Sequence, residues 1–256
     1  MSTSATPRGL LFGTAAESYE RFRLGYPDEV VDRTLAYSGR RLRTAVEVGA
    51  GTGKATRAFA SRGIRIVALE PDPEMYAVLE RETAGLPVAP VLSTFEAYDG
   101  PPVDLVYAAA AWHWTDPGSR WTHAGGLLDR GGVLALFGSQ LRIADADLEM
   151  AARNAIGDMV EDSSFEPQEA SKLPATVGWS TDDIAGSGQF AEVESHELAR
   201  EVVVSQKEYI GHLSTVSAYL MLGLEDRQEV LRKISELVPA QVRLDASVSL
   251  QLARRL

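Results

Sequence analysis

The stretch that most constrains the fold is TAVEVGAGTGK, at residues 44–54. Its first part, 44–48, is typical of a parallel strand, whose apolar residues run together because both faces are buried. Gly49, Gly51 and Gly53 follow, so the backbone must turn sharply, with something lying against it where a Cβ would clash. A helix predicted from Lys54 offers unpaired N–H groups and a positive dipole end. The stretch therefore predicts an α/β fold with a ligand-binding turn at the carboxyl end of a strand.

Two familiar phosphate-binding turns do not fit this stretch. A P-loop needs a glycine five positions before its Gly-Lys pair and a Ser or Thr after it, but Val48 and Ala55 occupy those places. A dinucleotide turn needs G-x-G-x-x-G, and here Lys54 stands at the position of the third glycine. The sequence thus disfavours a nucleotide held through its phosphates.

Two acidic residues indicate what the turn binds instead. Glu70 ends the apolar run IRIVALE, at the distance where a carboxylate accepts hydrogen bonds from both hydroxyls of a ribose. Glu47, beside the turn, would repel a pyrophosphate and would suit a cationic amino group. We therefore expect a ligand that carries a ribose.

A family resemblance agrees with this expectation. VEVGAGTGKAT (46–56) and VALEPDPEMYAVL (67–79) resemble motif I and the next motif of class I S-adenosylmethionine-dependent methyltransferases. AESYERFRLGYPDEVV (16–31) and FEAYDGPPVDLVYAAAAWHWTD (95–116) are similar to a narrower group, the small-molecule methyltransferases of the trans-aconitate methyltransferase type (methyltransferase type 11). The resemblance covers roughly residues 15–140 and is faint beyond them.

The resemblance implies a fold, a cofactor and a site. The fold is a Rossmann-like seven-stranded mixed sheet whose strand 7 is antiparallel, with helices on both faces and a helical cap. The cofactor is S-adenosylmethionine, which leaves as S-adenosylhomocysteine. The implied cofactor-binding residues are Tyr19, Arg23, Glu47, Gly49, Gly51, Thr52, Gly53, Glu70, Pro71, Met75, Thr94, Phe95, Glu96, Ala109 and Trp112.

In this family pattern, Tyr19 and Arg23 reach the carboxylate of the methionine part, which the guanidinium fork of an arginine suits. Arg21 could serve instead of Arg23. Tyr19 also shares a helical face with Phe22 and Tyr26, which by itself indicates simple packing.

Other predicted contacts concern the nucleoside. Met75 would lie against the adenine face, and the turn at 93–96 would hold the adenine edge. Each position also has a structural explanation: a helix-start carboxylate for Glu70, a core position for Met75, and an ordinary capped turn for 93–96.

Two tryptophans and a histidine follow the fourth predicted strand, after small residues at 108–111 that allow close approach of the cofactor. Histidine is the side chain best suited to accept a proton near neutral pH, so His113 is a candidate catalytic base. The alternative is that His113 forms a hydrogen-bonded wall of the cofactor pocket. The Asn/Asp-Pro-Pro-Tyr/Phe motif of adenine N6 methyltransferases is absent here, which disfavours methylation of bases.

Composition limits the partners. The net charge is −11, with Lys/Arg clusters only at Arg40-Arg41 and Arg254-Arg255, whereas a nucleic-acid backbone needs a basic face. The absence of cysteine excludes disulfides, thiolate metal sites and a Cys nucleophile, and no spacing of His and carboxylates suggests a metal. The early run GLLF is too short for a signal peptide and no stretch reaches spanning length, so we expect a cytoplasmic protein without a membrane partner.

The sequence predicts a single methyltransferase domain over 1–256. Its core lies at about 40–140 and 190–256, with cofactor-covering helices at 15–38 and a cap or insertion at about 141–189. Strict alternation over 242–252 predicts one half-buried strand that closes the sheet, and another strand is expected within 191–204. Residues 129–132 should form a turn, and the polar, acidic stretch 161–189 reads as an irregular lid or a surface excursion.

We expect methyl transfer to an oxygen, nitrogen or carbon atom of a small, mainly apolar or aromatic acceptor in secondary metabolism, by a monomer or homodimer. The sulfonium methyl group is already activated, and alignment alone can contribute about 7–11 kcal/mol, so a base is optional. Three alternatives remain: a nicotinamide-dependent oxidoreductase of similar topology, a cofactor-binding protein without catalysis, and a methyltransferase whose acidic lid holds a protein substrate.

Overall fold

The computed structural model describes residues 13–156 and 181–256, which fall into two compact units. One contains residues 25–139, 181–198 and 248–256 and is here called the large-sheet unit. The other contains residues 13–24, 140–156 and 199–247 and is called the small-sheet unit. Residues 157–180, the remaining part of the predicted 141–189 insertion, lie outside the described residues.

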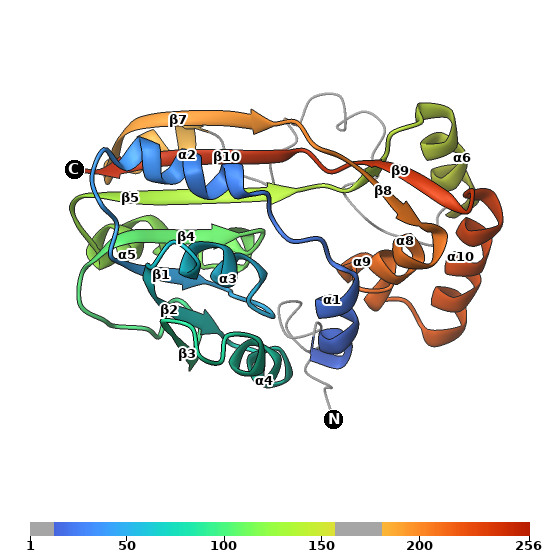
Figure 1. Ribbon diagram of the computed structural model, residues 1–256, viewed down its shortest axis with the longest axis horizontal. Coiled ribbons are helices and arrows are strands. Elements are labelled where there is room, and N and C mark those ends of the chain that lie inside the picture. The colour runs from blue at the N-terminus through green and yellow to red at the C-terminus, as the bar shows by residue number, and fades with distance from the viewer. Residues whose placement is uncertain (1–12, 157–180) are drawn as a thin grey trace. The chain divides into compact units, whose positions relative to one another are not determined.

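The large-sheet unit contains a seven-stranded mixed sheet (Figure 1). Strand β10 is antiparallel to both of its neighbours, β5 and β7, while β3, β2, β1, β4 and β5 run parallel. The predicted mixed sheet with an antiparallel closing strand is therefore confirmed. In spatial order the strands are β3 (Val88–Leu92), β2 (Arg65–Glu70), β1 (Thr44–Val48), β4 (Val103–Ala109), β5 (Leu128–Ser139), β10 (Val248–Arg255) and β7 (Phe190–Leu198).

Helices cover both faces of this sheet. Residues from α2 (Asp28–Ser38), α3 (Lys54–Ala60) and α4 (Pro73–Glu82) share a buried cluster with Ala45 and Leu105 of the strands. Residues from α5 (Arg120–Leu127) and α7 (Thr181–Gly186) share another with Val46 and Val106. Successive strand residues point to opposite faces, so the continuous apolar runs of β1 and β4 serve both clusters.

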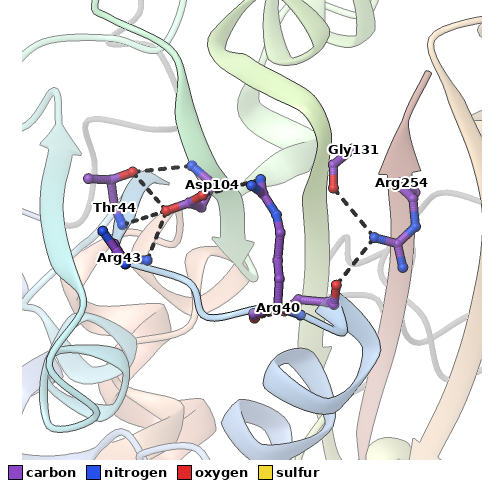
Figure 2. A network of polar contacts seen from close by, with 7 residues as sticks. Arg40, Arg43, Thr44, Asp104, Gly131 and Arg254 are labelled. Carbon is purple, nitrogen blue, oxygen red and sulfur yellow. Dashed lines mark hydrogen bonds and ion pairs between the residues drawn. The ribbon is translucent and has the colours of Figure 1, made fainter.

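An ion-pair and hydrogen-bond network fixes the amino ends of β1 and β4 (Figure 2). Asp104 Oδ2 accepts hydrogen bonds from the backbone N–H groups of Arg43 (2.8 Å) and Thr44 (3.2 Å). Arg40 pairs with Asp104 Oδ1 at 3.2 Å. Arg254 pairs with Glu192 at 2.7 Å and donates to backbone carbonyls, including that of Gly131. One arginine from each predicted basic cluster thus has an acidic partner.

The small-sheet unit contains the antiparallel strands β6 (Arg142–Ile143), β9 (Gln241–Asp245) and β8 (Glu201–Ser205). Its apolar core includes Tyr209, Tyr219, Val230 and Leu244. Its helical elements are η2 (Gly13–Ala15), α1 (Ala16–Phe22), α6 (Ala146–Ile156), α8 (Gln206–Leu213), α9 (Ser217–Leu220) and α10 (Leu224–Leu237).

The prediction of a single strand over 242–252 was wrong. The alternating stretch forms β9 and β10, which belong to different sheets. The break lies at Ala246-Ser247, where Asp245 Oδ1 accepts a hydrogen bond from the Ser247 N–H (2.9 Å) and the Ala246 N–H bonds the Arg200 carbonyl (2.8 Å). A side chain that bonds its own backbone two residues on makes a turn without interrupting the apolar alternation.

Three further boundaries differ from prediction. The expected strand within 191–204 forms β7 and β8, again in two sheets. The expected turn at 129–132 is part of β5, whose pairing with β4 shifts register there. Within the stretch predicted to be irregular, residues 181–186 form α7, which packs its buried Ile184 against the sheet.

Candidate functional site

The glycine turn between β1 and α3 has the conformation that its sequence requires. Gly49, Gly51 and Gly53 have φ values of +64°, +58° and +87°, in the left-handed region that L side chains rarely adopt. A Cβ on Gly49 would lie 2.6 Å from the Ala111 Cβ, and one on Gly53 would lie 2.9 Å from Leu79 Cδ1. At these two positions, other side chains of the protein lie against the backbone. The sequence had suggested a ligand there.

Glu70 holds this turn from the end of β2. Its Oε2 accepts a hydrogen bond from the Gly51 N–H at 2.7 Å, and its Oε1 accepts one from the Asp72 N–H at 2.9 Å. Burial raises the pKa of Glu70 to about 7, against the lowering effect of these two bonds. Each carboxylate oxygen can accept a second hydrogen bond, so both remain able to receive a ribose hydroxyl.

Glu47 is fully buried beside the turn, on the face covered by α3. Its Oε2 accepts hydrogen bonds from the hydroxyls of Thr56 (2.5 Å) and Tyr107 (2.8 Å). Its Oε1 has no hydrogen-bond partner among the described residues. Burial, partly offset by these two bonds, raises the pKa of Glu47 to about 8.

A strained residue marks the carboxyl end of β4. Ala110 has a φ of +54°, which is uncommon for a residue with a Cβ, and its N–H bonds the Phe137 carbonyl at 2.7 Å. This bend carries the chain from β4 into η3 (Trp112–Trp114) and brings Ala111 against Gly49. Backbone strain of this kind is concentrated at functional sites.

Trp112 and Phe95 come together beneath this edge, with ring centroids 5.5 Å apart. Both are buried, and Trp112 is part of the apolar core of the large-sheet unit. The indole Nε1 of Trp112 has no hydrogen-bond partner among the described residues. A buried N–H without a partner is rare in a native protein, and the predicted cofactor contact of Trp112 stays a prediction.

His113 and Trp114 are exposed and lie side by side, with ring centroids 4.4 Å apart. The pKa of His113 is lowered below its usual 6.5, first by the protein that partly surrounds the ring and then by the charge of Arg120. A lowered pKa keeps the imidazole neutral at pH 7, the form that can accept a proton. A neutral imidazole is compatible with the base role, which stays a prediction.

The predicted adenine-edge turn follows β3. The Thr94 hydroxyl accepts a hydrogen bond from the Ala97 N–H (3.3 Å), as an ordinary turn residue does, and Glu96 accepts one from the Asp116 N–H (2.8 Å). His123 Nε2 lies 2.9 Å from the Phe95 carbonyl, which anchors the turn to α5. Glu96 thus joins the turn to the segment that follows the Trp-His-Trp motif.

Four other predicted residues lie along the same elements of the large-sheet unit. Thr52 is buried in the turn, and its hydroxyl has no hydrogen-bond partner among the described residues. Met75 is buried in the first turn of α4, while Pro71 and Ala109 are partly exposed beside Glu70 and at the end of β4.

Tyr19 and Arg23 belong to the small-sheet unit, and their role toward a cofactor remains a prediction. Within that unit, Arg23 lies over the Tyr19 ring, 5.1 Å from its centroid. It donates to the hydroxyl (2.9 Å) and the carbonyl (3.0 Å) of Thr215. Arg23 therefore has a structural partner that the sequence did not indicate.

Tyr107 and Thr56 are site residues that the sequence reasoning missed. Tyr107 lies opposite Glu47 in the register of β4 on β1, and Thr56 lies in the first turn of α3. A signal for Tyr107 was available, because a tyrosine within an apolar strand needs a partner for its hydroxyl. Which residue is that partner depends on the register between two strands far apart in sequence.

Within residues 13–156 and 181–256, no helix is both long and apolar enough to span a bilayer. No group of three or more His, Asp or Glu side chains in these ranges is arranged to hold a metal ion.

Comparison with known sequences agrees with this site. The family described as "Methyltransferase domain" matches residues 46–136, from β1 into β5. Uncharacterized methyltransferases of Mycobacterium bovis and Mycobacterium tuberculosis are 40% identical over 139 residues. That alignment covers 53% of this chain and 55% of each relative, so it spans about half of the relatives' own length.

Solved structures of other proteins have folds similar to that of this chain. A protein of Anaeromyxobacter dehalogenans described as a type II methyltransferase has a TM-score of 0.63 at 20% identity, covering 91% of this chain and 98% of that one. The phosphoethanolamine N-methyltransferase 2 of Haemonchus contortus, solved with phosphomonomethylethanolamine and S-adenosylhomocysteine, has a TM-score of 0.59 at 13% identity, covering 100% of this chain and 61% of that one.

These comparisons do not single out the trans-aconitate methyltransferase type, so the narrower resemblance stays a prediction. The glycine turn, the sheet order with its antiparallel β10, the family match and the methyltransferase relatives all agree. Residues 46–136 therefore match a methyltransferase domain, and the site and the fold support a class I S-adenosylmethionine-dependent methyltransferase.

Proposed function

We propose that the chain binds S-adenosylmethionine at the glycine turn and transfers its methyl group to a small-molecule acceptor. The observation that carries this proposal is the pair of buried carboxyl groups beside the turn, Glu47 and Glu70. Glu47 Oε1 is a buried acceptor without a partner among the described residues, which fits the ammonium group of a methionine part. Glu70 can still accept hydrogen bonds from two ribose hydroxyls.

When bound, the cofactor supplies an activated sulfonium methyl group, and the protein has to align an acceptor and exclude water. Trp114 presents an aromatic surface beside His113, which favours a mainly apolar or aromatic acceptor. His113 Nδ1 or Nε2 would take the proton of an acceptor hydroxyl or amine. For an acceptor that is already anionic, no proton has to move and His113 would only line the site.

Calorimetric titration with S-adenosylhomocysteine, and with NAD in parallel, tests the proposed function. We expect micromolar binding of the first and none of the second. Glu70→Gln places an amide N–H₂ where backbone N–H groups and ribose hydroxyls need an acceptor, so binding should weaken about 10–100-fold. The control is Glu74→Gln, an exposed position on α4, which should bind like the unmodified chain.

Binding of NAD would instead favour the nicotinamide oxidoreductase, and binding of neither ligand would refute the proposal. If S-adenosylhomocysteine binds, methyl transfer from labelled S-adenosylmethionine to a panel of phenols, carboxylic acids and amines would identify the acceptor. His113→Gln should then slow transfer to a neutral acceptor and leave S-adenosylhomocysteine affinity unchanged.

A further inference from the structure

The buried cluster around Glu47 is more elaborate than binding an amino group requires. Three elements meet in it: β1 supplies Glu47, α3 supplies Thr56 and β4 supplies Tyr107. All three side chains are completely buried. Both hydroxyls donate to the same carboxyl oxygen, Oε2, at 2.5 Å and 2.8 Å, while Oε1 has no partner among the described residues.

The two hydroxyl groups are held in place by packing. The Tyr107 ring stacks on Phe59, with centroids 4.4 Å apart and planes 25° apart. Phe59 and Thr56 both project from α3, which begins directly after the glycine turn. Neither donor can leave Glu47 without disturbing the core, so the orientation of the carboxyl group is set before any ligand arrives.

We propose that Tyr107 and Thr56 are positioning residues: they hold Glu47 by Oε2 so that Oε1 receives the cofactor's ammonium group, and Glu47 releases a proton as the cofactor binds. This inference rests on the proposed function and assigns roles to two residues outside the glycine turn. It concerns how the methionine part is recognised, before any methyl transfer.

Charge balance explains the proton release. The pKa of Glu47 is raised to about 8 as the net result of several effects. Burial raises it most and the charge of Glu70 also raises it, while the bonds from Thr56 and Tyr107 and the charge of Arg57 lower it. At pH 7 the ligand-free carboxyl group is therefore mostly protonated. An ammonium group at Oε1 favours the carboxylate, so the complex holds an ion pair and one proton passes to the buffer.

The first test uses S-adenosylhomocysteine as the probe, titrated at several pH values from 6 to 7.5 in two buffers of different ionisation enthalpy. We expect release of about 0.9 proton at pH 7 and an affinity that rises nearly tenfold per pH unit. The range stops at 7.5 because the ligand's own amino group loses its proton near pH 8. 5′-Methylthioadenosine lacks the amino acid part but keeps the ribose that Glu70 would bind, so at pH 7 it should release about 0.9 proton fewer than S-adenosylhomocysteine.

The second test uses Tyr107→Phe and Thr56→Val, each of which removes one hydroxyl and keeps the side chain's shape. Loss of a donor to Oε2 raises the pKa of Glu47 further, so the pH profile for S-adenosylhomocysteine should move to higher pH. Affinity at pH 7 should fall about tenfold, while 5′-methylthioadenosine affinity changes less than twofold. The controls are Tyr37→Phe and Thr34→Val, whose hydroxyls bond the backbone carbonyls of Glu192 and Val30.

The outcomes separate this inference from the proposed function. If S-adenosylhomocysteine does not bind at all, the proposed function fails. If it binds without proton release and with a flat pH profile, only this inference is overturned. Tyr107→Phe and Thr56→Val could instead weaken the binding of both ligands equally and leave the pH profile unmoved. That result would show a merely structural role for the two residues and would also overturn this inference. Where 5′-methylthioadenosine binds too weakly to measure, the shift of the pH profile decides.

Discussion

At the scale of single residues, two glycines of the turn are required by the protein itself. Gly49 has a φ of +64°, and a Cβ there would meet the Ala111 Cβ at 2.6 Å. Gly85 has a similar φ of +81°, but a Cβ there would meet nothing within 4 Å. Alanine variants at positions 49 and 85 can therefore be compared by their free energies of unfolding. The comparison separates the effect of backbone conformation from the effect of the clash.

We predict that Gly49→Ala lowers the free energy of unfolding by about 2–5 kcal/mol, because left-handed strain and overpacking add. Gly85→Ala should cost only about 1–2 kcal/mol. Urea denaturation measures both. Adding Ala111→Gly to Gly49→Ala should recover the clash part, about 1–3 kcal/mol. If that double variant is no more stable than additivity predicts, Ala111 is not what excludes a side chain at position 49.

At the scale of elements, the sheet is fixed at the end opposite the glycine turn. Asp104, at the start of β4, accepts from the backbone of Arg43 and Thr44 and so joins the chain entering β1 to its neighbour (Figure 2). The carboxyl end of β4 carries the strained Ala110. The polar network and the functional edge therefore lie at opposite ends of the same two strands.

Replacing Asp104 by Ala should lower the free energy of unfolding by about 1–3 kcal/mol, since it leaves N–H donors without their acceptor. Arg40→Ala removes only the ion pair, whose arginine side chain is 44% exposed, and should cost about 0–1 kcal/mol. Thermal unfolding of the two variants compares them directly. Equal losses would mean that the ion pair, and not the backbone hydrogen bonds, holds these strand ends together.

At the scale of the whole molecule, two buried carboxyl groups make stability depend on pH. The pKa of Glu47 rises from 4.5 in the unfolded chain to about 8, and that of Glu70 to about 7. A raised pKa means that the folded chain binds more protons. Each group's contribution to stability is therefore fully present below pH 4.5 and is lost as the pH rises toward its folded pKa.

We predict that Glu47→Gln removes part of this dependence. The free energy of unfolding of the variant, minus that of the unmodified chain, should increase between pH 5 and 8 by up to about 1.4 kcal/mol per pH unit. Urea denaturation at four pH values in this range gives the difference. Glu74→Gln, at an exposed position, should leave the curve unchanged. Parallel curves for Glu47→Gln and the unmodified chain would contradict the raised pKa.

Features that depend only on neighbouring residues could be predicted from the amino-acid sequence. The alternating glycines 49, 51 and 53 adopt the left-handed conformation that they predicted, and Glu70 stands at the end of β2, where the apolar run ends. A strand near the carboxyl end was predicted from the alternating pattern, whereas its antiparallel direction was implied by the family resemblance. Local conformation and strand burial are encoded within a few residues, so these predictions did not need the rest of the chain.

Contacts between residues far apart in the sequence could be seen only in the folded chain. It divided the alternating stretch 242–252 between two sheets, because a short turn at Ala246-Ser247 does not disturb the alternation. It gave Arg23 a partner in Thr215, 192 positions away, and gave Glu47 a partner in Tyr107, 60 positions away. Such partners depend on strand register and on helix packing, and these are set by the summed burial of the whole core.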